Sequence, residues 1–324
     1  MKQLLVPSVF VRRLLPLALR SLAWGATSLS LIACGGGGGG GGSNSGQDPD
    51  PVVVDIPVAY VQRPIPLDED GEPVYPDVFE PDAFNPGGEL YIKARATAQA
   101  EVINITRAEY ETDLSKYPDY TPETPNYDVK DVSVSPDGSR LVFAMRAPDV
   151  DPNDDYDPTW NIWEYQLESK LLHRVITSEF EAEKGDDVSP HYLPDGRILF
   201  TSNRQKRSKE ILLDEGKPQF GAVTEQDDDI TSFLLHTVKD DGTDIQQLSY
   251  NQSHDIQPSV MPDGRLLFMR WQGTGQNARL SFYTSNPDGT DVQFYFGAET
   301  LNEEPAETMT EAPRLFRPQV MADG

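Results

Sequence analysis

Residues 135–143 read Ser-Pro-Asp-Gly-Ser-Arg-Leu-Val-Phe, and this phrase decides the fold. It returns at 193–200 as Leu-Pro-Asp-Gly-Arg-Ile-Leu-Phe and at 261–268 as Met-Pro-Asp-Gly-Arg-Leu-Leu-Phe. A further copy begins at 316–324, where Phe-Arg-Pro-Gln-Val-Met-Ala-Asp-Gly matches residues 256–264. The aspartates at 137, 195, 263 and 323 are separated by 58, 68 and 60 residues. Repeats of this length are typical of solenoids, propellers and other repeat arrays.

Each copy of the phrase predicts a tight turn followed by a buried strand. Proline presets φ for the first corner of a type I turn, aspartate suits the second corner, and glycine adopts the left-handed conformation that closes a bulged hairpin. The strand that follows is apolar at nearly every position, which indicates burial on both faces. Sheets stacked on both sides give that burial in the blades of a β-propeller. The predicted turn residues are Pro136, Asp137, Gly138, Pro194, Asp195, Gly196, Pro262, Asp263 and Gly264.

We therefore predict an all-β protein, a β-propeller of four-stranded antiparallel blades that is incomplete in this chain. A second repeated phrase, Asp-Gly-Thr-Asp at 241–244 and 288–291, would join the two outer strands of a blade. The Pro- and acid-rich stretch 64–88 is expected to be a surface excursion or a lid. Because the chain stops inside a fifth unit, we expect a fragment of a longer protein. The predicted propeller is 52–324, with blades at 52–110, 130–178, 187–250 and 255–298 and the start of the next at 314–324.

Composition limits the classes of partner and cofactor. The formal net charge of −26 gives the chain no electrostatic reason to bind nucleic acid, so we predict no nucleic-acid partner. The single cysteine, Cys34, excludes an intrachain disulfide, a Cys-x-x-Cys metal pair and a Cys-x-x-Cys-His haem attachment site within these residues.

The amino-terminal segment predicts export and a lipid anchor. Residues 1–33 combine a few basic residues with an apolar stretch too short to span a bilayer, as in a signal peptide. The end of this stretch, Leu31-Ile32-Ala33-Cys34, resembles a bacterial lipobox, which implies cleavage before Cys34 and lipid on that residue. The alternative is an ordinary secretory signal with a chance cysteine. Residue 35 is glycine and not aspartate, which by the sorting rule for such lipoproteins implies the outer membrane, facing the periplasm or the cell surface. The Gly-rich segment 34–51 is predicted to be a flexible tether.

Two groups of polar residues are candidates for ligand binding. Residues 149–157 begin like an EF-hand loop, with Asp154 and Trp160 where glycine and glutamate would stand. A solvated acidic loop is the alternative to an irregular calcium site. The basic cluster 204–209 would dock an acidic partner or form a plain solvated loop. The calcium candidates are Asp149, Asp151, Asn153 and Asp155.

The four histidines are scattered along the sequence. His191 and His254 each lie shortly before the Pro-Asp-Gly turn of their blade. Both could therefore face the propeller mouth and act as ligands. The alternative is a histidine at a strand end that is bonded to backbone. No pair among these two, His173 and His236 has His-x-x-x-His spacing.

The repeats resemble those of a known family. Ser-Pro-Asp-Gly-x-Arg-Leu-Val-Phe with the outer Asp-Gly-Thr-Asp hairpin is similar to the WD40-like (PD40) repeat of TolB propellers. The opening at 58–64 and the Asp-x-x-Pro-x-x-x-Pro-Asp-Gly-Arg units at 187–197 and 255–265 are more similar to lipoproteins related to the hydrazine synthase alpha subunit. In that family the propeller is followed by a haem-bearing part. No residue here matches a haem site, so the resemblance carries over neither haem nor redox chemistry.

The sequence favours a lipid-anchored cell-envelope propeller that binds an envelope protein or a small ligand at its mouth. It contains no catalytic motif, Gly-x-Ser-x-Gly included, so no catalytic residue is assigned and the chain is not predicted to be an enzyme. No cofactor is expected apart from calcium at the acidic loop. The alternative is the amino-terminal propeller of a larger haem-bearing or hydrolytic enzyme with its catalytic part beyond residue 324. A structural spacer is a third hypothesis.

Overall fold

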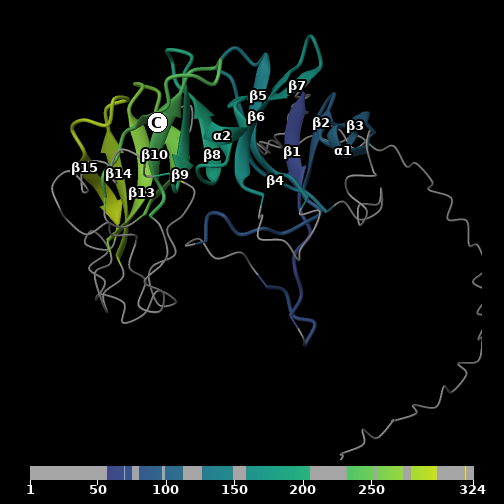
Figure 1. The fold of residues 1–324 in the computed structure, drawn as a ribbon, viewed down its shortest axis with the longest axis horizontal. Coiled ribbons are helices and arrows are strands. Elements are labelled where there is room, and N and C mark those ends of the chain that lie inside the picture. Colours follow the sequence, from purple (N-terminus) through teal and green to yellow (C-terminus); the bar gives the residue numbers. More distant parts are fainter. Residues whose placement is uncertain are drawn as a thin grey trace, which may run out of the picture. The chain divides into compact units, whose positions relative to one another are not determined.

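The described part of the chain consists of antiparallel β-sheets. The computed structural model describes residues 57–68, 70–74, 80–96, 99–111, 126–148, 158–204, 232–251, 254–272, 279–297 and 318. Within them the strands form four sheets, each made from strands consecutive in the sequence (Figure 1). One sheet has three strands and three have four, which confirms the predicted all-β, incomplete propeller.

The sheets are numbered here in chain order. Sheet 1 contains β1 (Val58–Gln62), β2 (Glu89–Lys93) and β3 (Val102–Asn104). Sheet 2 contains β4 (Asp128–Val134), β5 (Arg140–Arg146), β6 (Trp160–Gln166) and β7 (Leu171–Arg174). Sheet 3 contains β8 (Asp187–Tyr192), β9 (Ile198–Ser202), β10 (Leu234–Val238) and β11 (Gln246–Gln247). Sheet 4 contains β12 (Asp255–Val260), β13 (Leu266–Gln272), β14 (Arg279–Ser285) and β15 (Gln293–Gly297). Two short helices, α1 (Arg107–Glu111) and α2 (Glu179–Ala182), connect sheets 1 to 2 and 2 to 3. Neither helix has the length that a membrane crossing requires, and no other helix occurs among the described residues.

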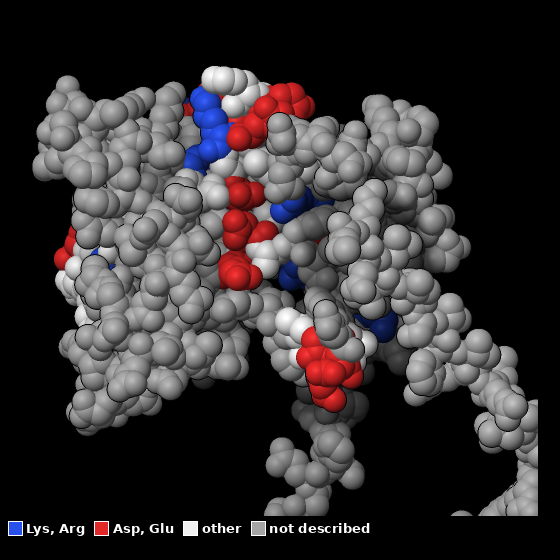
Figure 2. Space-filling view, turned by 60° about the horizontal axis from the view of Figure 1, so that its bottom comes forward, with Lys and Arg blue, Asp and Glu red and all other residues white. Residues whose placement is uncertain are grey.

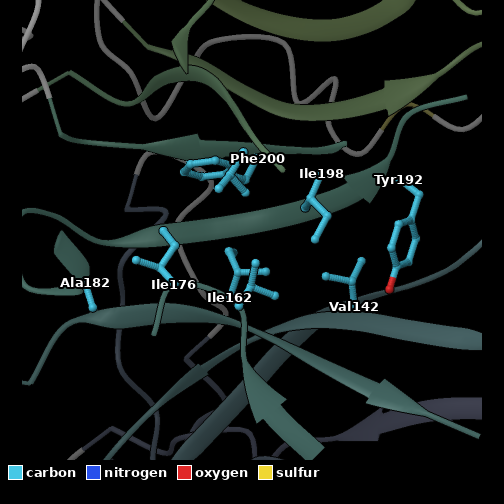
Figure 3. Close-up of a cluster of buried hydrophobic side chains, with 9 residues drawn as sticks. Val142, Ile162, Ile176, Ala182, Tyr192, Ile198 and Phe200 are labelled. Carbon is cyan, nitrogen blue, oxygen red and sulfur yellow. The ribbon is translucent and has the colours of Figure 1, made fainter. Parts of the chain in front are cut away.

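Apolar side chains from facing sheets build the core. The strands that follow the Pro-Asp-Gly turns are buried on both faces, as predicted: all five residues of β9 are buried. Figure 3 shows Val142 and Ile162 of sheet 2 facing Ile198 and Phe200 of sheet 3. All four side chains are completely buried. Burial of each contributes about 1.5–3 kcal/mol, so the stacking of sheets is the main source of stability.

The two repeated phrases contact each other within a sheet. Arg197, which follows the Pro-Asp-Gly turn of sheet 3, donates to the Asp244 carboxylate at 2.9 Å and to the Asp244 carbonyl at 2.7 Å. Arg265 makes the same contacts with Asp291 in sheet 4, at 3.1 and 3.2 Å. The turn between strands one and two is thereby tied to the turn between strands three and four. This explains why the two phrases recur together in the sequence.

Glycines in the outer turns let successive sheets approach closely. Gly242 has φ +77°, and a Cβ there would lie 2.1 Å from the carbonyl oxygen of Val175 in the preceding sheet. Gly289 has φ +80°, and its Cβ would lie 2.2 Å from the carbonyl oxygen of Leu248, again in the preceding sheet. Backbone therefore touches backbone at both places, and only glycine fits.

The first strands of sheets 2, 3 and 4 (β4, β8 and β12), called the inner strands here, each contain a bulge that the sequence analysis did not predict. The pairing of the first strand with the second shifts once in sheets 2, 3 and 4. The bulge residues Asp131, Ser189 and Gln257 have φ of +57°, +53° and +51°, respectively. Left-handed non-glycine residues are uncommon and concentrate at functional sites. Three in equivalent positions therefore direct attention to the inner strands.

Strand β1 runs opposite to its neighbour β4. Arg63, just beyond the end of β1, forms an ion pair with Asp128 at the start of β4. In contrast, β4 and β8 run in the same direction, because Asp131 contacts Ser189 and Ser133 contacts His191.

Candidate functional site

A cavity of about 280 Å³ lies along the inner strands of sheets 2, 3 and 4. The bulge residues of all three strands line it, so the bulges place one polar side chain per sheet in the same space. Sheet 1 and the repeat unit at 316–324 each add one apolar residue. The described lining residues of this inner-strand cavity are Val61, Asp131, Val132, Ser189, His191, Gln257, Pro258 and Pro318.

Hydrogen bonds between neighbouring sheets hold the polar side of the cavity. The Asp131 carboxylate accepts from the Ser189 backbone N–H at 3.2 Å and from the Ser189 hydroxyl at 3.1 Å. His191 Nδ1 lies 3.2 Å from the Ser133 hydroxyl. The Asp131 carboxylate on β4 is thus held by β8, and the His191 ring on β8 is held by β4. The polar side of the cavity is therefore preorganised for a ligand.

His191 is neutral at physiological pH. Burial lowers its pKa to about 4, and the nearby Asp131 carboxylate opposes this shift only partly. The prediction that His191 faces the propeller mouth agrees with its position in the cavity lining. His191 can therefore exchange hydrogen bonds with a ligand without carrying charge.

His254 and His236 have structural contacts. Nδ1 of His254 accepts from the Phe233 backbone N–H at 3.0 Å, and the ring stacks on Trp271 with centroids 5.3 Å apart. His236 Nδ1 lies 2.9 Å from the Leu234 carbonyl. Burial lowers the pKa of both histidines to about 4. The hypothesis that His254 faces the mouth is wrong because its ring is packed in the core, where backbone and aromatic contacts hold it.

Three buried aspartates pair with arginines at one end of the inner strands. Asp128, Asp187 and Asp255 are each the first residue of an inner strand, and none exposes its side chain. Arg63, Arg204 and Arg270 bind them through two nitrogens each. Paired carboxylate–guanidinium contacts combine charge with fixed geometry. Arg63 follows β1, Arg204 follows β9 and Arg270 lies within β13, so each pair ties a neighbouring strand to the start of an inner strand.

Residues 80–88, called the strap here, fasten the connection after β1 to sheet 2. The Lys130 ammonium donates to the Pro81 carbonyl, and the Trp160 indole N–H donates to the Asp82 carbonyl at 2.7 Å. The Asn85 backbone N–H donates to the Asp128 carboxylate at 2.8 Å. Phe84 packs against a buried cluster contributed by sheets 2, 3 and 4. The part of the predicted excursion 64–88 that forms the strap is thus bound to sheet 2.

Lys130 makes the stability of the strap region depend on pH. Burial lowers its pKa from the ordinary 10.5 to about 8. Between these values the unfolded chain binds more protons than the folded one, so the free energy of unfolding rises as the pH increases from 8 to 10.5, by at most about 3 kcal/mol. We expect Lys130→Met to abolish that rise in urea unfolding curves. Lys239→Met, at a half-exposed site, is the control and should keep it; parallel curves for wild type and Lys130→Met would contradict the prediction.

A second cavity, of about 560 Å³, lies between the outer parts of sheets 2 and 3. Its charged side chains are already paired with protein groups. The Arg204 guanidinium binds Asp187 and the Glu181 carbonyl, Lys184 binds the Glu181 carboxylate, and Asp244 binds Arg197. This cavity therefore offers a ligand little unsatisfied charge.

Several predicted residues lie outside the described part of the chain. They are Cys34 and the calcium candidates Asp149, Asp151, Asn153 and Asp155. In the part that is described, no three His, Cys, Asp or Glu side chains are grouped so as to hold a metal ion. Of the basic cluster 204–209 only Arg204 is described, and it is buried in the pair with Asp187. For Arg204 the solvated-loop and docking interpretations are both wrong, because the buried Asp187 carboxylate binds it.

Acidic side chains gather on the surface shown in Figure 2. Among the described residues of this view, Asp and Glu side chains form a row, with Lys and Arg beside it. The surface thus reflects the acidic balance of the whole sequence. Such a field favours the approach of positively charged molecules.

Sequence reasoning missed the bulge residues and the arginines of the buried pairs. The bulge residues are Asp, Ser and Gln, so residue type gives no signal; their signal is position, five residues before the proline of each Pro-Asp-Gly turn. The arginines share no column: Arg204 stands ten residues after Pro194, Arg270 stands eight after Pro262, and Arg63 precedes the first Pro-Asp-Gly turn. Aligning the repeats on the turn would have found the bulge positions but not the arginines.

Solved structures of other proteins are similar to this chain at low sequence identity. No family model and no curated protein matches the sequence. Among solved structures, hydrazine synthase of Kuenenia stuttgartiensis is similar at 15% identity and TM-score 0.47, over 75% of this chain and 32% of that one. TolB from Acinetobacter baumannii matches at 14% identity and TM-score 0.39, over 65% and 38%. A TolB from Agrobacterium tumefaciens matches at 15% and 0.32, over 69% and 78%. The chain spans about a third of the first two proteins.

Proposed function

We propose that this protein is a lipid-anchored β-propeller of the bacterial cell envelope that binds a ligand in the inner-strand cavity. The observation that carries the proposal is the lining of that cavity by equivalent bulge residues of three sheets. Backbone strain retained at the same place in three repeats is expected where side chains must be aimed at a ligand. Cross-strand hydrogen bonds at Asp131 and His191 support a preorganised site.

A fragment screen tests ligand binding. Ligand-observed NMR on the purified protein should find small molecules that bind the wild type and that lose binding in Gln257→Trp, where a larger side chain occupies the cavity. Glu179→Trp, on exposed α2 away from the cavity, is the matched control and should retain binding. If no compound distinguishes wild type from Gln257→Trp, the cavity is not a binding site.

Anchoring is tested at Cys34. In a Gram-negative host, the wild type should incorporate labelled fatty acid and sediment with the outer membrane. Cys34→Ala should lose the label, because the lipobox thiol is the acceptor, and two or more acyl chains are needed for a stable anchor. Cys34→Ala that still incorporates label would contradict the lipoprotein assignment.

A further inference from the structure

The strap lies near the end of the inner-strand cavity where the inner strands begin. Phe84 of the strap packs against the buried cluster that contains Val188 of β8 and Ile256 of β12. The next residue of each of these strands, Ser189 or Gln257, lines the cavity. The cluster that Phe84 covers is therefore continuous with the cavity lining.

The strap is bound to the sheets without being a strand of any of them. Its hydrogen bonds to sheet 2, described above, use backbone carbonyls and a backbone N–H of the strap. A further bond, from the Gly87 N–H to the Tyr127 carbonyl at 2.8 Å, is of the same kind. No strand pairing of the described sheets includes the strap, so the sheets keep their own pairing when the strap leaves. Segments attached in this way open locally at a lower free energy than the whole fold.

Phe84 is the one large apolar side chain of the strap, whose sequence is Glu-Pro-Asp-Ala-Phe-Asn-Pro-Gly-Gly. The Arg146 guanidinium lies 4.4 Å from the centroid of its ring, which is a cation–π contact. The Phe84 side chain is partly exposed, so it covers the cluster from the solvent side. Since backbone groups make the hydrogen bonds of the strap, Phe84→Ala removes this cover and leaves the bonding groups in place.

Charges beneath the strap oppose its closure. Burial, and after it the Asp186 carboxylate, raises the pKa of Asp82 in the strap. At pH 7 the ionised Asp82 carboxylate is therefore less stable in the closed strap than in water. Lys130 and Arg146 attract that carboxylate and offset only part of this cost. The closed strap thus contains an electrostatic cost that its opening relieves.

We propose that the strap is a lid on the inner-strand cavity, with Phe84 as its plug, and that it opens and closes while the sheets stay folded. When closed, the lid excludes water from the strand-start end of the cavity; when open, it gives a small molecule a way in. The role in ligand entry rests on the proposed binding function, whereas the opening of the strap does not.

Thiol labelling beneath the strap tests the lid. In a Cys34→Ala background, Ile256→Cys places the only thiol in the cluster that Phe84 covers, and Leu235→Cys places it in the core between sheets 3 and 4. Each of these side chains is 1% exposed in the wild type. Under native conditions, iodoacetamide should label Ile256→Cys at least about tenfold faster than Leu235→Cys, since lid opening costs less than unfolding. Adding Phe84→Ala should accelerate labelling of Ile256→Cys by a further factor of about ten.

The Leu235→Cys variant separates lid opening from loss of stability. Its thiol is reached only when sheets 3 and 4 part, so Phe84→Ala should change its labelling rate by less than about threefold. Phe84→Leu keeps an apolar plug and should keep the slow labelling of Ile256→Cys. Equal labelling rates at the two positions overturn the proposal, as does a Phe84→Ala variant that accelerates both equally or neither, because the strap would then open only with the whole fold.

The lid and the binding function fail in different ways. If the labelling rates differ as expected while no compound is sensitive to Gln257→Trp, the lid stands and the binding function falls. If compounds bind and are lost in Gln257→Trp while the two thiols are labelled equally, the cavity binds ligands and the lid falls.

Discussion

Replacing Gly242 with alanine is expected to destabilise the propeller by about 2–5 kcal/mol. Left-handed backbone costs an L-residue about 1–2 kcal/mol, and forcing a methyl group into packed structure adds about 1–3 kcal/mol. Here the methyl group would meet the Val175 carbonyl, which belongs to another sheet and cannot move without moving that sheet. Chemical unfolding followed by tryptophan fluorescence measures the effect.

Gly196 provides the matched control for Gly242. It also has a left-handed φ, of +89°, but a Cβ there would have no atom within 4 Å. Gly196→Ala should therefore lose only the conformational part, about 1–2 kcal/mol. Equal losses for the two variants would mean that the contact between sheets 2 and 3 does not limit the position.

Removing the Asp187 carboxylate should have an effect of similar size. Arg204 exposes 6% of its side chain and Asp187 none, so Asp187→Ala leaves a buried guanidinium without its counter-ion. Breaking a buried pair from one side costs about 3–5 kcal/mol. The measurement is again the free energy of unfolding by urea.

A double variant shows whether the loss of stability in Asp187→Ala comes from the unpaired charge or from lost packing. Asp187→Leu with Arg204→Met replaces both charges by apolar groups and should lie within about 2 kcal/mol of the wild type, since such replacements are often neutral. Glu179→Ala breaks the exposed contact with Arg174 and should cost no more than about 1 kcal/mol. A double variant as unstable as Asp187→Ala would show that packing, and not the unpaired charge, is responsible.

Local turn chemistry explains why the fold could be predicted. Pro136-Asp137-Gly138 and its copies specify a turn within three residues, and the following strand shows its burial in composition alone. Both signals are short-range, so one sequence contains them. The outer Asp-Gly-Thr-Asp turns are predictable for the same reason, although their ties to Arg197 and Arg265 are not.

The site depends on relations that a single sequence does not display. Asp131, Ser189 and Gln257 share a backbone conformation but no chemistry, because the bulge comes from strand pairing. Arg63 and Asp128 are 65 residues apart, so nothing local connects them. His191 and His254 looked alike before folding. One follows a bulge and faces the cavity, whereas the other precedes β12 and is buried.

The contacts of Gly242 and Gly289 bear on how such a protein can change through gene duplication. At both places the glycine contacts a main-chain carbonyl, of Val175 or Leu248. These contacts between blades therefore do not depend on which side chain the carbonyl residue has. A duplicated unit would bring its own glycine and offer the same carbonyl to the next unit. Blade number could thus change without a new recognition surface arising each time, while the bulge positions diverge freely to suit new ligands.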